Sequence, residues 1–189
     1  MRPLTKLAQI ETFLFEDVSP RFAADGSIGA FDFFCIVIWK ANRAKSKVAT
    51  RLLKAGAGDL ESSVRKLTTE IYQASSHSER LKLIMSDWGF RLPMASAILT
   101  VLYPHEFTVY DIRVCEILKR FETLANATSH DTIWREYSLY KQAVIAENPD
   151  QISLRDRDRE LWGRSFALQL EKQIAEGFTR VEPDAITDA

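Results

Sequence analysis

A series of basic residues in the first third of the chain has the spacing of a phosphate-binding surface. Their separations are 3, 4, 4 and 3 residues, and no acidic residue lies among them. If one helix carries the whole series, its side chains line one side, because residues three and four apart are neighbours on a helix surface. Such a row could follow the backbone of DNA, and the alternative is a helix face that simply meets water. The series is Lys40, Arg43, Lys47, Arg51 and Lys54.

Residues that commonly hold metals or cofactors show no comparable pattern. The three histidines, His77, His105 and His130, share no spacing typical of metal ligands. The sequence has neither a glycine-rich phosphate loop nor a Gly-x-Ser-x-Gly nucleophile turn. Cys35 and Cys115 stand singly in apolar runs, which favours buried thiols and excludes a four-cysteine iron–sulfur cluster. We therefore expect no metal and no cofactor.

The overall composition is that of an ordinary folded protein. Of 189 residues, 46% are hydrophobic and 27% are charged, and the net charge of −1 excludes a general polyanion binder. The longest apolar stretch, residues 33–39, is too short to cross a bilayer. The first residues also lack the apolar core of a signal peptide. These features predict a cytoplasmic protein with no membrane association.

Helical periodicity dominates the chain, which has only 7 glycines and 6 prolines. We predict an all-α fold, a two-lobed helical bundle in which residues 1–178 form a single domain and the two lobes share a core. The hairpin region of this domain is expected at about 77–121, and the acidic segment 179–189 is expected to be disordered. Asp59, and Ser76 or Ser78, are expected to cap helices. The helix predicted over residues 30–42 is very apolar and is expected to be a buried central helix. The helix that begins at Asp111 is expected to have an apolar face of Val114, Ile117, Leu118 and Phe121. The other predicted helices are 4–15, ended by Ser19-Pro20, a helix ending near 54, 59–74, a helix ending near 88, 92–103, 131–147 and 153–176.

Residues 88–113 combine several features in a fixed order. A helix ends in a tight turn, where Gly89 suits a left-handed C-terminal cap. An alanine-rich helix follows and ends at Pro104, and after a loop Asp111 opens the next helix. This order resembles the helix-hairpin-helix and Gly/Pro-Asp (HhH-GPD) region of the DNA glycosylase superfamily. The hairpin of that family reads approximately Leu-Pro-Gly-Val-Gly-x-Lys-Thr-Ala, followed by an apolar helix, a loop and Val-Asp-Thr-His. The resemblance implies the two-lobed fold of these enzymes.

Carried over residue by residue, the resemblance places the first hairpin glycine at Gly89 and the second at Arg91. The family lysine falls on Pro93 and the family aspartate on Asp111. Hairpin glycines let backbone N–H groups approach a DNA phosphate, and the guanidinium of Arg91 could itself contact phosphate. Proline cannot act as a nucleophile, so the resemblance implies an activity without the lysine-dependent lyase step.

In this resemblance Asp111 is the catalytic residue. Its carboxylate would stabilise positive charge on the sugar as the base leaves, or position the attacking water. The alternative is an ordinary N-cap, and one aspartate can serve both purposes. The implied function is a DNA-binding protein, and more narrowly a monofunctional base-excision hydrolase. Two alternatives stay open: a non-catalytic scaffold for nucleic acid or protein, which the changed hairpin favours, and a helical interaction protein with no nucleic-acid role.

The resemblance also implies the residues that would surround the DNA. Trp88 and Tyr110 are candidates for the border of a base pocket, although both could simply pack, and Trp39, Trp134 and Trp162 are expected in the core. The functional hypothesis requires the turn near residue 90 and the carboxylate of Asp111 to converge on one groove. The expected DNA contacts are Gly89, Arg91, Ala95, Arg113, Lys40, Arg43, Lys47 and Arg51.

Three further elements, residues 38–43, 93–99 and 158–162, are similar to a set of uncharacterised bacterial proteins related to these glycosylases. This similarity covers roughly residues 30–165. It implies a fold more than an activity, because one fold can carry many functions.

Overall fold

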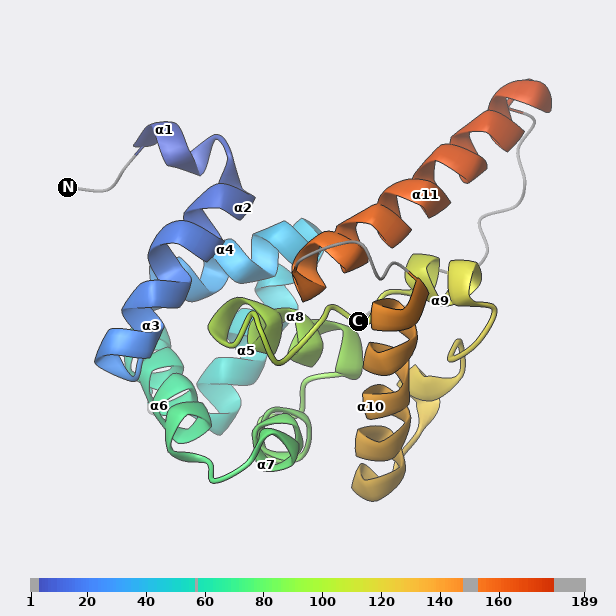
Figure 1. Ribbon diagram of the computed structural model, residues 1–189. Coiled ribbons are helices and arrows are strands. Elements are labelled where there is room, and N and C mark those ends of the chain that lie inside the picture. Colours follow the sequence, from blue (N-terminus) through green and yellow to red (C-terminus); the bar gives the residue numbers. More distant parts are fainter. Residues whose placement is uncertain (1–3, 57, 148–152, 179–189) are drawn as a thin grey trace. The chain divides into compact units, whose positions relative to one another are not determined.

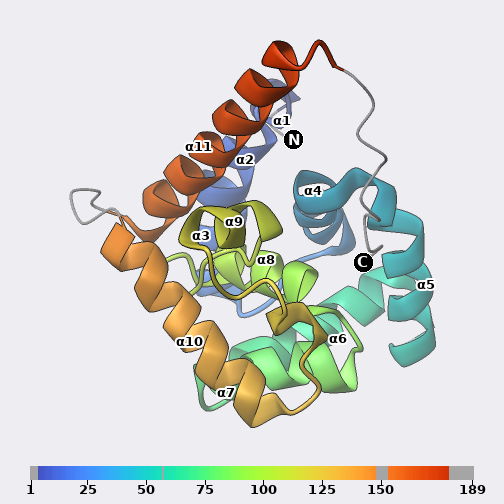
Figure 2. The same cartoon turned by 90° about the vertical axis from the view of Figure 1, so that its right-hand side faces the viewer.

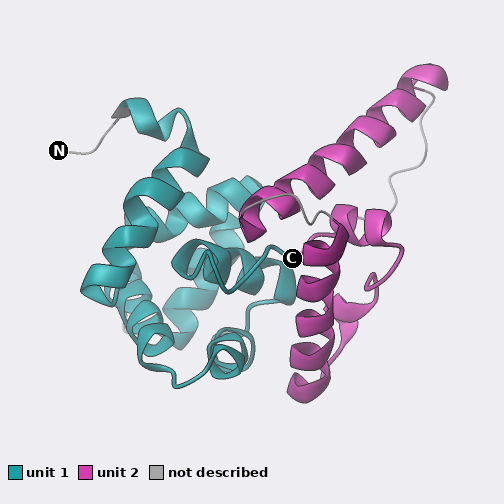
Figure 3. Ribbon diagram, in the orientation of Figure 1, with its two compact units in different colours: residues 1–109 teal, residues 110–189 magenta. Residues whose placement is uncertain are grey.

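The computed structural model describes residues 4–56, 58–147 and 153–178, and the regular elements in these ranges are all helical (Figure 1). The all-α prediction is therefore confirmed. The chain divides into two compact units, residues 1–109 and 110–189 (Figure 3). This boundary falls inside the predicted hairpin region 77–121, and a core common to both lobes stays a prediction. The predicted acidic tail, 179–189, lies outside the described residues.

Unit 1 is a succession of helices joined by short turns, some of them π-helical or 3₁₀ (labelled η). Its elements are α1 (Leu4–Leu7), α2 (Ile10–Phe13), η1 (Leu14–Val18), α3 (Ser19–Asp25), α4 (Ala30–Ala41), η2 (Asn42–Ala44), α5 (Lys45–Ala55), α6 (Leu60–Gln73), α7 (His77–Lys82), η3 (Leu83–Asp87) and α8 (Leu92–Leu102). The predicted caps of α6 and α7 are confirmed. The carboxylate of Asp59 accepts a hydrogen bond from the Ser62 N–H at 2.9 Å, and the Ser76 hydroxyl accepts one from the Glu79 N–H at 3.1 Å.

The predicted break at Ser19-Pro20 is wrong. The chain stays helical through the π-helical turn η1, where the Ser19 N–H donates to the Leu14 carbonyl, and it continues into α3. Pro20 lies in the first turn of α3. Proline donates no backbone hydrogen bond and therefore often ends a helix. A π-helical turn shifts the hydrogen-bond register by one residue, so here the helix continues past Pro20.

The centre of unit 1 is α8, and not the predicted central helix over residues 30–42. Leu92 and every residue from Met94 to Leu102 are buried, so α8 has no solvent face. A helix that is apolar on all sides belongs in a core. The corresponding helix α4 packs on α8 but leaves Phe31 and Ile38 exposed. Edge-to-face rings extend this core, with the Phe33 and Phe90 centroids 6.3 Å apart.

Unit 2 is built around a short helix that begins at Asp111. Its elements are α9 (Ile112–Leu118), η4 (Leu124–Asn126), α10 (His130–Glu147) and α11 (Leu154–Ala175). Both α10 and α11 contact α9, which lies beside them in Figure 2. The predicted apolar face of α9 included Phe121, but the helix ends at Leu118, and Phe121 is buried from a left-handed backbone position with φ of 78°. Among the described residues of both units, no helix is long and apolar enough to cross a membrane.

Buried phenol and thiol groups lie in the interior of unit 2. The Tyr110 hydroxyl donates a hydrogen bond to the Phe121 carbonyl at 2.7 Å, and the rings of Tyr110 and Tyr140 lie 5.4 Å apart. Burial, which penalises the charged form, raises the pKa of both tyrosines and raises the pKa of the Cys115 thiol to about 12. Cys115 and Cys35 are both buried, as the sequence predicts.

These raised pKa values predict loss of stability at alkaline pH. Each buried group stabilises the fold fully at pH values below the pKa that it has in the unfolded chain, which is about 8.5 for cysteine and about 10 for tyrosine. This stabilisation is lost as the pH rises through the higher pKa that the group has in the folded protein. We expect the free energy of unfolding to fall from about pH 9 upward. At pH 11 the tyrosinate absorbance at 295 nm should rise further when guanidinium unfolds the protein, because Tyr110 and Tyr140 become free to ionise.

Tyr140→Phe should reduce the guanidinium-dependent increase, because it removes a buried phenol. Identical absorbance titrations of the folded and unfolded wild type would contradict the prediction.

Candidate nucleic-acid interface

The turn that the sequence singles out lies in unit 1, between η3 and α8. The Phe90 N–H donates to the Ile84 carbonyl at 3.0 Å and closes the turn. Between them Gly89 has φ of 68°, the left-handed conformation predicted for it. Only glycine adopts this conformation without cost, because a Cβ would crowd the following carbonyl oxygen. Arg91 then precedes the first residue of α8, with its own backbone extended.

Two buried aromatic residues hold the turn in place. Trp88 and Phe90 are 3% and 2% exposed, although Gly89 between them is exposed. The Trp88 indole N–H donates a hydrogen bond to Glu70 Oε2 at 2.8 Å, which satisfies the polar atom of an otherwise buried ring. The turn is therefore fixed on both sides, with Gly89 and Arg91 presented to solvent.

The basic helix α5 lies against this turn. The Arg51 guanidinium carbon is 5.5 Å from the centroid of the Phe90 ring, which is within cation–π range. A Cβ built on Gly89 would lie 3.9 Å from Arg51 Cδ and Nε, so the arginine stem passes directly beside the glycine. Lys47 and Lys54, four residues before and three after Arg51, share its side of the helix. Within the described part of the chain, no salt bridge is formed by Arg51 or Lys54.

A further cation near the turn was not found from the sequence. The Lys66 ammonium, on α6, is 5.9 Å from the centroid of the Trp88 ring. The sequence gives no sign of this contact, because Lys66 lies outside the basic series and only the packing of α6 beside the turn brings the two together.

The condition that one helix carries all five basic residues of the series is not met. Lys40 is on α4 and Arg43 is in η2, and the chain turns between them at Ala41, whose φ and ψ are −161° and 88°. A helix has one continuous face, so this turn separates Lys40 from the cations that follow it, and Arg43 lies in the 3₁₀ turn that precedes α5. Lys47, Arg51 and Lys54 remain together on α5.

Several predicted contacts are excluded by burial. The side chain of Ala95 is 0% exposed and its N–H donates to the Arg91 carbonyl at 2.9 Å, so Ala95 is not available to DNA. Trp88 and Tyr110, the candidates for a pocket border, are 3% and 2% exposed and bind Glu70 and the Phe121 carbonyl. The structure therefore favours core packing over a place at the border of a base pocket for both residues.

Asp111 and Arg113 lie in unit 2. One carboxylate oxygen of Asp111 accepts a hydrogen bond from the Arg113 N–H at 3.1 Å, so Asp111 is the N-cap of α9, as predicted. The side chain is half-buried. The Arg113 guanidinium lies over the rings of Trp162 and Phe166, at 5.3 and 6.0 Å. Because the turn at Gly89 belongs to unit 1, its convergence with Asp111 on one groove stays a prediction.

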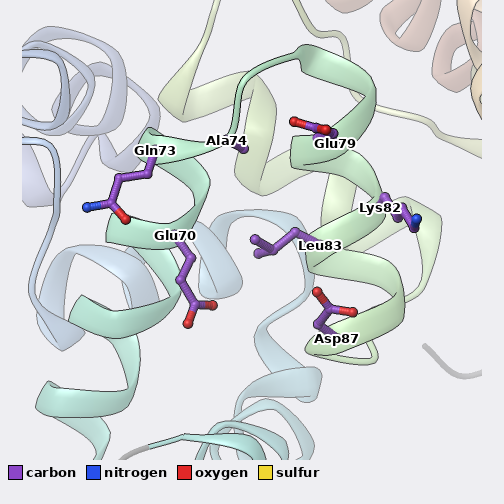
Figure 4. Close-up of a pocket in the computed structure, with 7 residues that line it drawn as sticks. All are labelled: Glu70, Gln73, Ala74, Glu79, Lys82, Leu83 and Asp87. Atoms are coloured by element: carbon purple, nitrogen blue, oxygen red, sulfur yellow. The ribbon is translucent and has the colours of Figure 1, made fainter.

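A cavity of about 450 Å³ in unit 1 has the opposite electrostatic character to α5. Residues of α6 face residues of α7 and η3 across it (Figure 4). Its three carboxylates, Glu70, Glu79 and Asp87, outnumber its single cation, Lys82. Hydrogen bonds from Ser75 hold the pKa of Glu79 below its usual value. A phosphate would be repelled here, so the cavity is unsuited to binding nucleic acid.

Comparison of the chain with protein-family models, with curated proteins and with solved structures gives no match. Among the described residues, no three His, Cys, Asp or Glu side chains gather as a metal-binding group.

The left-handed turn predicts a specific response to substitution at Gly89. Gly89→Ala should destabilise the folded protein by about 1 to 2 kcal/mol, because an alanine bears the steric cost of the left-handed backbone. Gly89→Asn should cost less, since asparagine adopts this conformation more readily. Chemical denaturation followed by circular dichroism measures both.

Gly163→Ala is the matched control. Gly163 is inside α11, and an added Cβ would meet no atom within 4 Å. This variant should gain up to about 1 kcal/mol from improved helix propensity. Equal effects at Gly89 and Gly163 would show that the turn imposes no backbone strain.

Proposed function

We propose that unit 1 binds DNA by its phosphate backbone. The observation that carries the proposal is the contact of Arg51 with the turn, because it joins two elements that the sequence had suggested separately, the basic helix and the hairpin-like turn. The turn offers exposed backbone at Gly89 and the guanidinium of Arg91. α5 adds Lys47, Arg51 and Lys54, and α6 adds Lys66.

This arrangement supports binding to a polyanion in spite of the net charge of −1. Arg51 and Lys66 contact the aromatic rings of the turn, and the carboxylates Glu70, Glu79 and Asp87 line the cavity of α6, α7 and η3. Local positive charge of this kind attracts a phosphate backbone and releases its counterions. The turn between η3 and α8, with its left-handed glycine, supports the resemblance to the helix-hairpin-helix DNA glycosylases from which the proposal began.

The second candidate is a monofunctional base-excision hydrolase, and Asp111 is the residue that favours it. A half-buried aspartate opens α9, at the position where the resemblance requires the charge-stabilising carboxylate. Pro93, in the first turn of α8, replaces the lysine of the lyase mechanism, so any activity would be hydrolysis alone. A non-catalytic scaffold would use the same aspartate only as a helix cap.

Salt dependence tests binding to the phosphate backbone. Arg51→Gln and Lys54→Gln should each lower the affinity for a duplex, and each should reduce the slope of log affinity against log salt by about 0.9 for every phosphate that is no longer neutralised. Lys82→Gln removes the same charge from the same unit but lies in the acidic cavity, so it should leave the slope unchanged. Fluorescence anisotropy with a labelled duplex at several salt concentrations provides the measurement. Equal reductions in affinity in all three variants would indicate a net-charge effect and reject the proposed surface.

Asp111→Asn separates the hydrolase from the scaffold. Asparagine caps a helix about as well as aspartate, so the variant should fold with little change in stability. Assayed on a panel of lesion-bearing duplexes, a hydrolase should lose base release by about 10²-fold or more, because a neutral amide cannot balance the charge on the sugar. Base release that survives the substitution would reject this mechanism. Duplex binding without base release in the wild type would favour the scaffold.

A further inference from the structure

Two aromatic side chains of α11 form an exposed stack in unit 2. Trp162 was expected in the core but is 43% exposed, and Phe166, one turn later, is 45% exposed. Their rings are nearly parallel, with an interplanar angle of 5° and centroids 5.6 Å apart. Large aromatic rings are usually buried, so a preformed and solvent-exposed pair is a surface suited to a flat ligand.

The stack is supported by α9. The buried residues of α11 are Leu161 and Ser165, and the Ser165 hydroxyl donates a hydrogen bond to Glu116 of α9 at 3.4 Å. Arg113, also on α9, brings its guanidinium to 5.3 Å from the Trp162 ring and 6.0 Å from the Phe166 ring. Its Nη1 atom is buried and has no hydrogen-bond partner among the described residues. Cation–π contact with the two rings is therefore the interaction that positions this guanidinium.

Basic residues extend the stack toward the start of α11. Arg159 and Arg155 precede Trp162 by three and seven residues, and Phe166 follows it by four, so the four side chains share one side of the helix. Arginines therefore flank the rings both along α11, where Arg159 also pairs with Asp156 at 3.5 Å, and, through Arg113, from α9. A nucleotide presents both a flat base and a phosphate, and it therefore matches aromatic rings that are flanked by arginines.

We propose that this surface binds single-stranded nucleic acid, with an unpaired base stacking on the Trp162–Phe166 pair and Arg113 and Arg159 attracting its phosphates. Base–aromatic stacking next to cations is the usual way in which proteins hold single strands without reading their sequence. The proposal extends the DNA-binding function of unit 1 and rests on it for the class of ligand. It uses different residues on a different unit, so the two can fail separately.

The test uses the full chain and two labelled probes of equal length, a single-stranded oligothymidylate and a fully paired duplex. Trp162→Leu and Phe166→Leu should each weaken binding of the oligothymidylate by roughly 5- to 150-fold, the usual effect of removing one stacking ring. Neither should change duplex affinity by more than about twofold. Trp162→Phe should keep most of the single-strand affinity, because it keeps a ring.

Leu168→Ala is the control variant, since Leu168 is 53% exposed on the same helix but lies outside the aromatic row. Unchanged oligothymidylate affinity in both leucine variants would overturn the proposal. A change of sedimentation coefficient in Trp162→Leu without a change of single-strand affinity would also overturn it, and would assign the surface to a second copy of the chain. Absence of duplex binding in the wild type, with single-strand binding that still depends on Trp162, would reject the function of unit 1 and sustain this one.

Discussion

The position of the turn at Gly89 depends on the burial of the aromatic residues on either side of it. Trp88 and Phe90 enter the interior of unit 1, and the indole hydrogen bond to Glu70 removes the cost of burying the Trp88 nitrogen. The backbone between the two anchored rings reverses through the left-handed conformation of Gly89. The same rings then serve as the surfaces on which Arg51 and Lys66 rest, so the anchor of the turn also places its cations.

The charge of unit 1 is divided between two regions of the same few elements. α6 contributes both Lys66, which lies beside Trp88, and Glu70, which accepts the indole hydrogen bond, and η3 ends in Asp87 just before the turn. A near-neutral protein can in this way hold one region that attracts phosphate and another that repels it. Such a division of charge would favour one orientation of a polyanionic ligand on the surface of unit 1. The reason is that the electrostatic field of a protein acts on a charged partner before the two make contact.

Unit 2 combines a tightly closed interior with an open aromatic surface. Tyr110, Tyr140 and Cys115 are buried with raised pKa values, and the backbone of α9 begins at the cap formed by Asp111. A helix that is fixed at its start gives Arg113, two residues later, a defined position over Trp162 and Phe166. The aspartate that the resemblance makes catalytic thus also orients the cation of the neighbouring stack, and Asp111→Asn keeps this second role because asparagine can form the same cap.

Local sequence was enough to predict the helical class, the caps at Asp59, Ser76 and Asp111, and the left-handed turn at Gly89. These features depend on hydrogen bonds and steric limits within a few residues. Packing between distant segments was needed to show that α8 is the central helix, that Ala95 is buried, that Trp162 is exposed, and that Lys66 joins the turn. Each of these depends on which remote side chains cover a residue. A periodic pattern shows that a helix has an apolar side, but the area that is buried is set by the elements that pack against it.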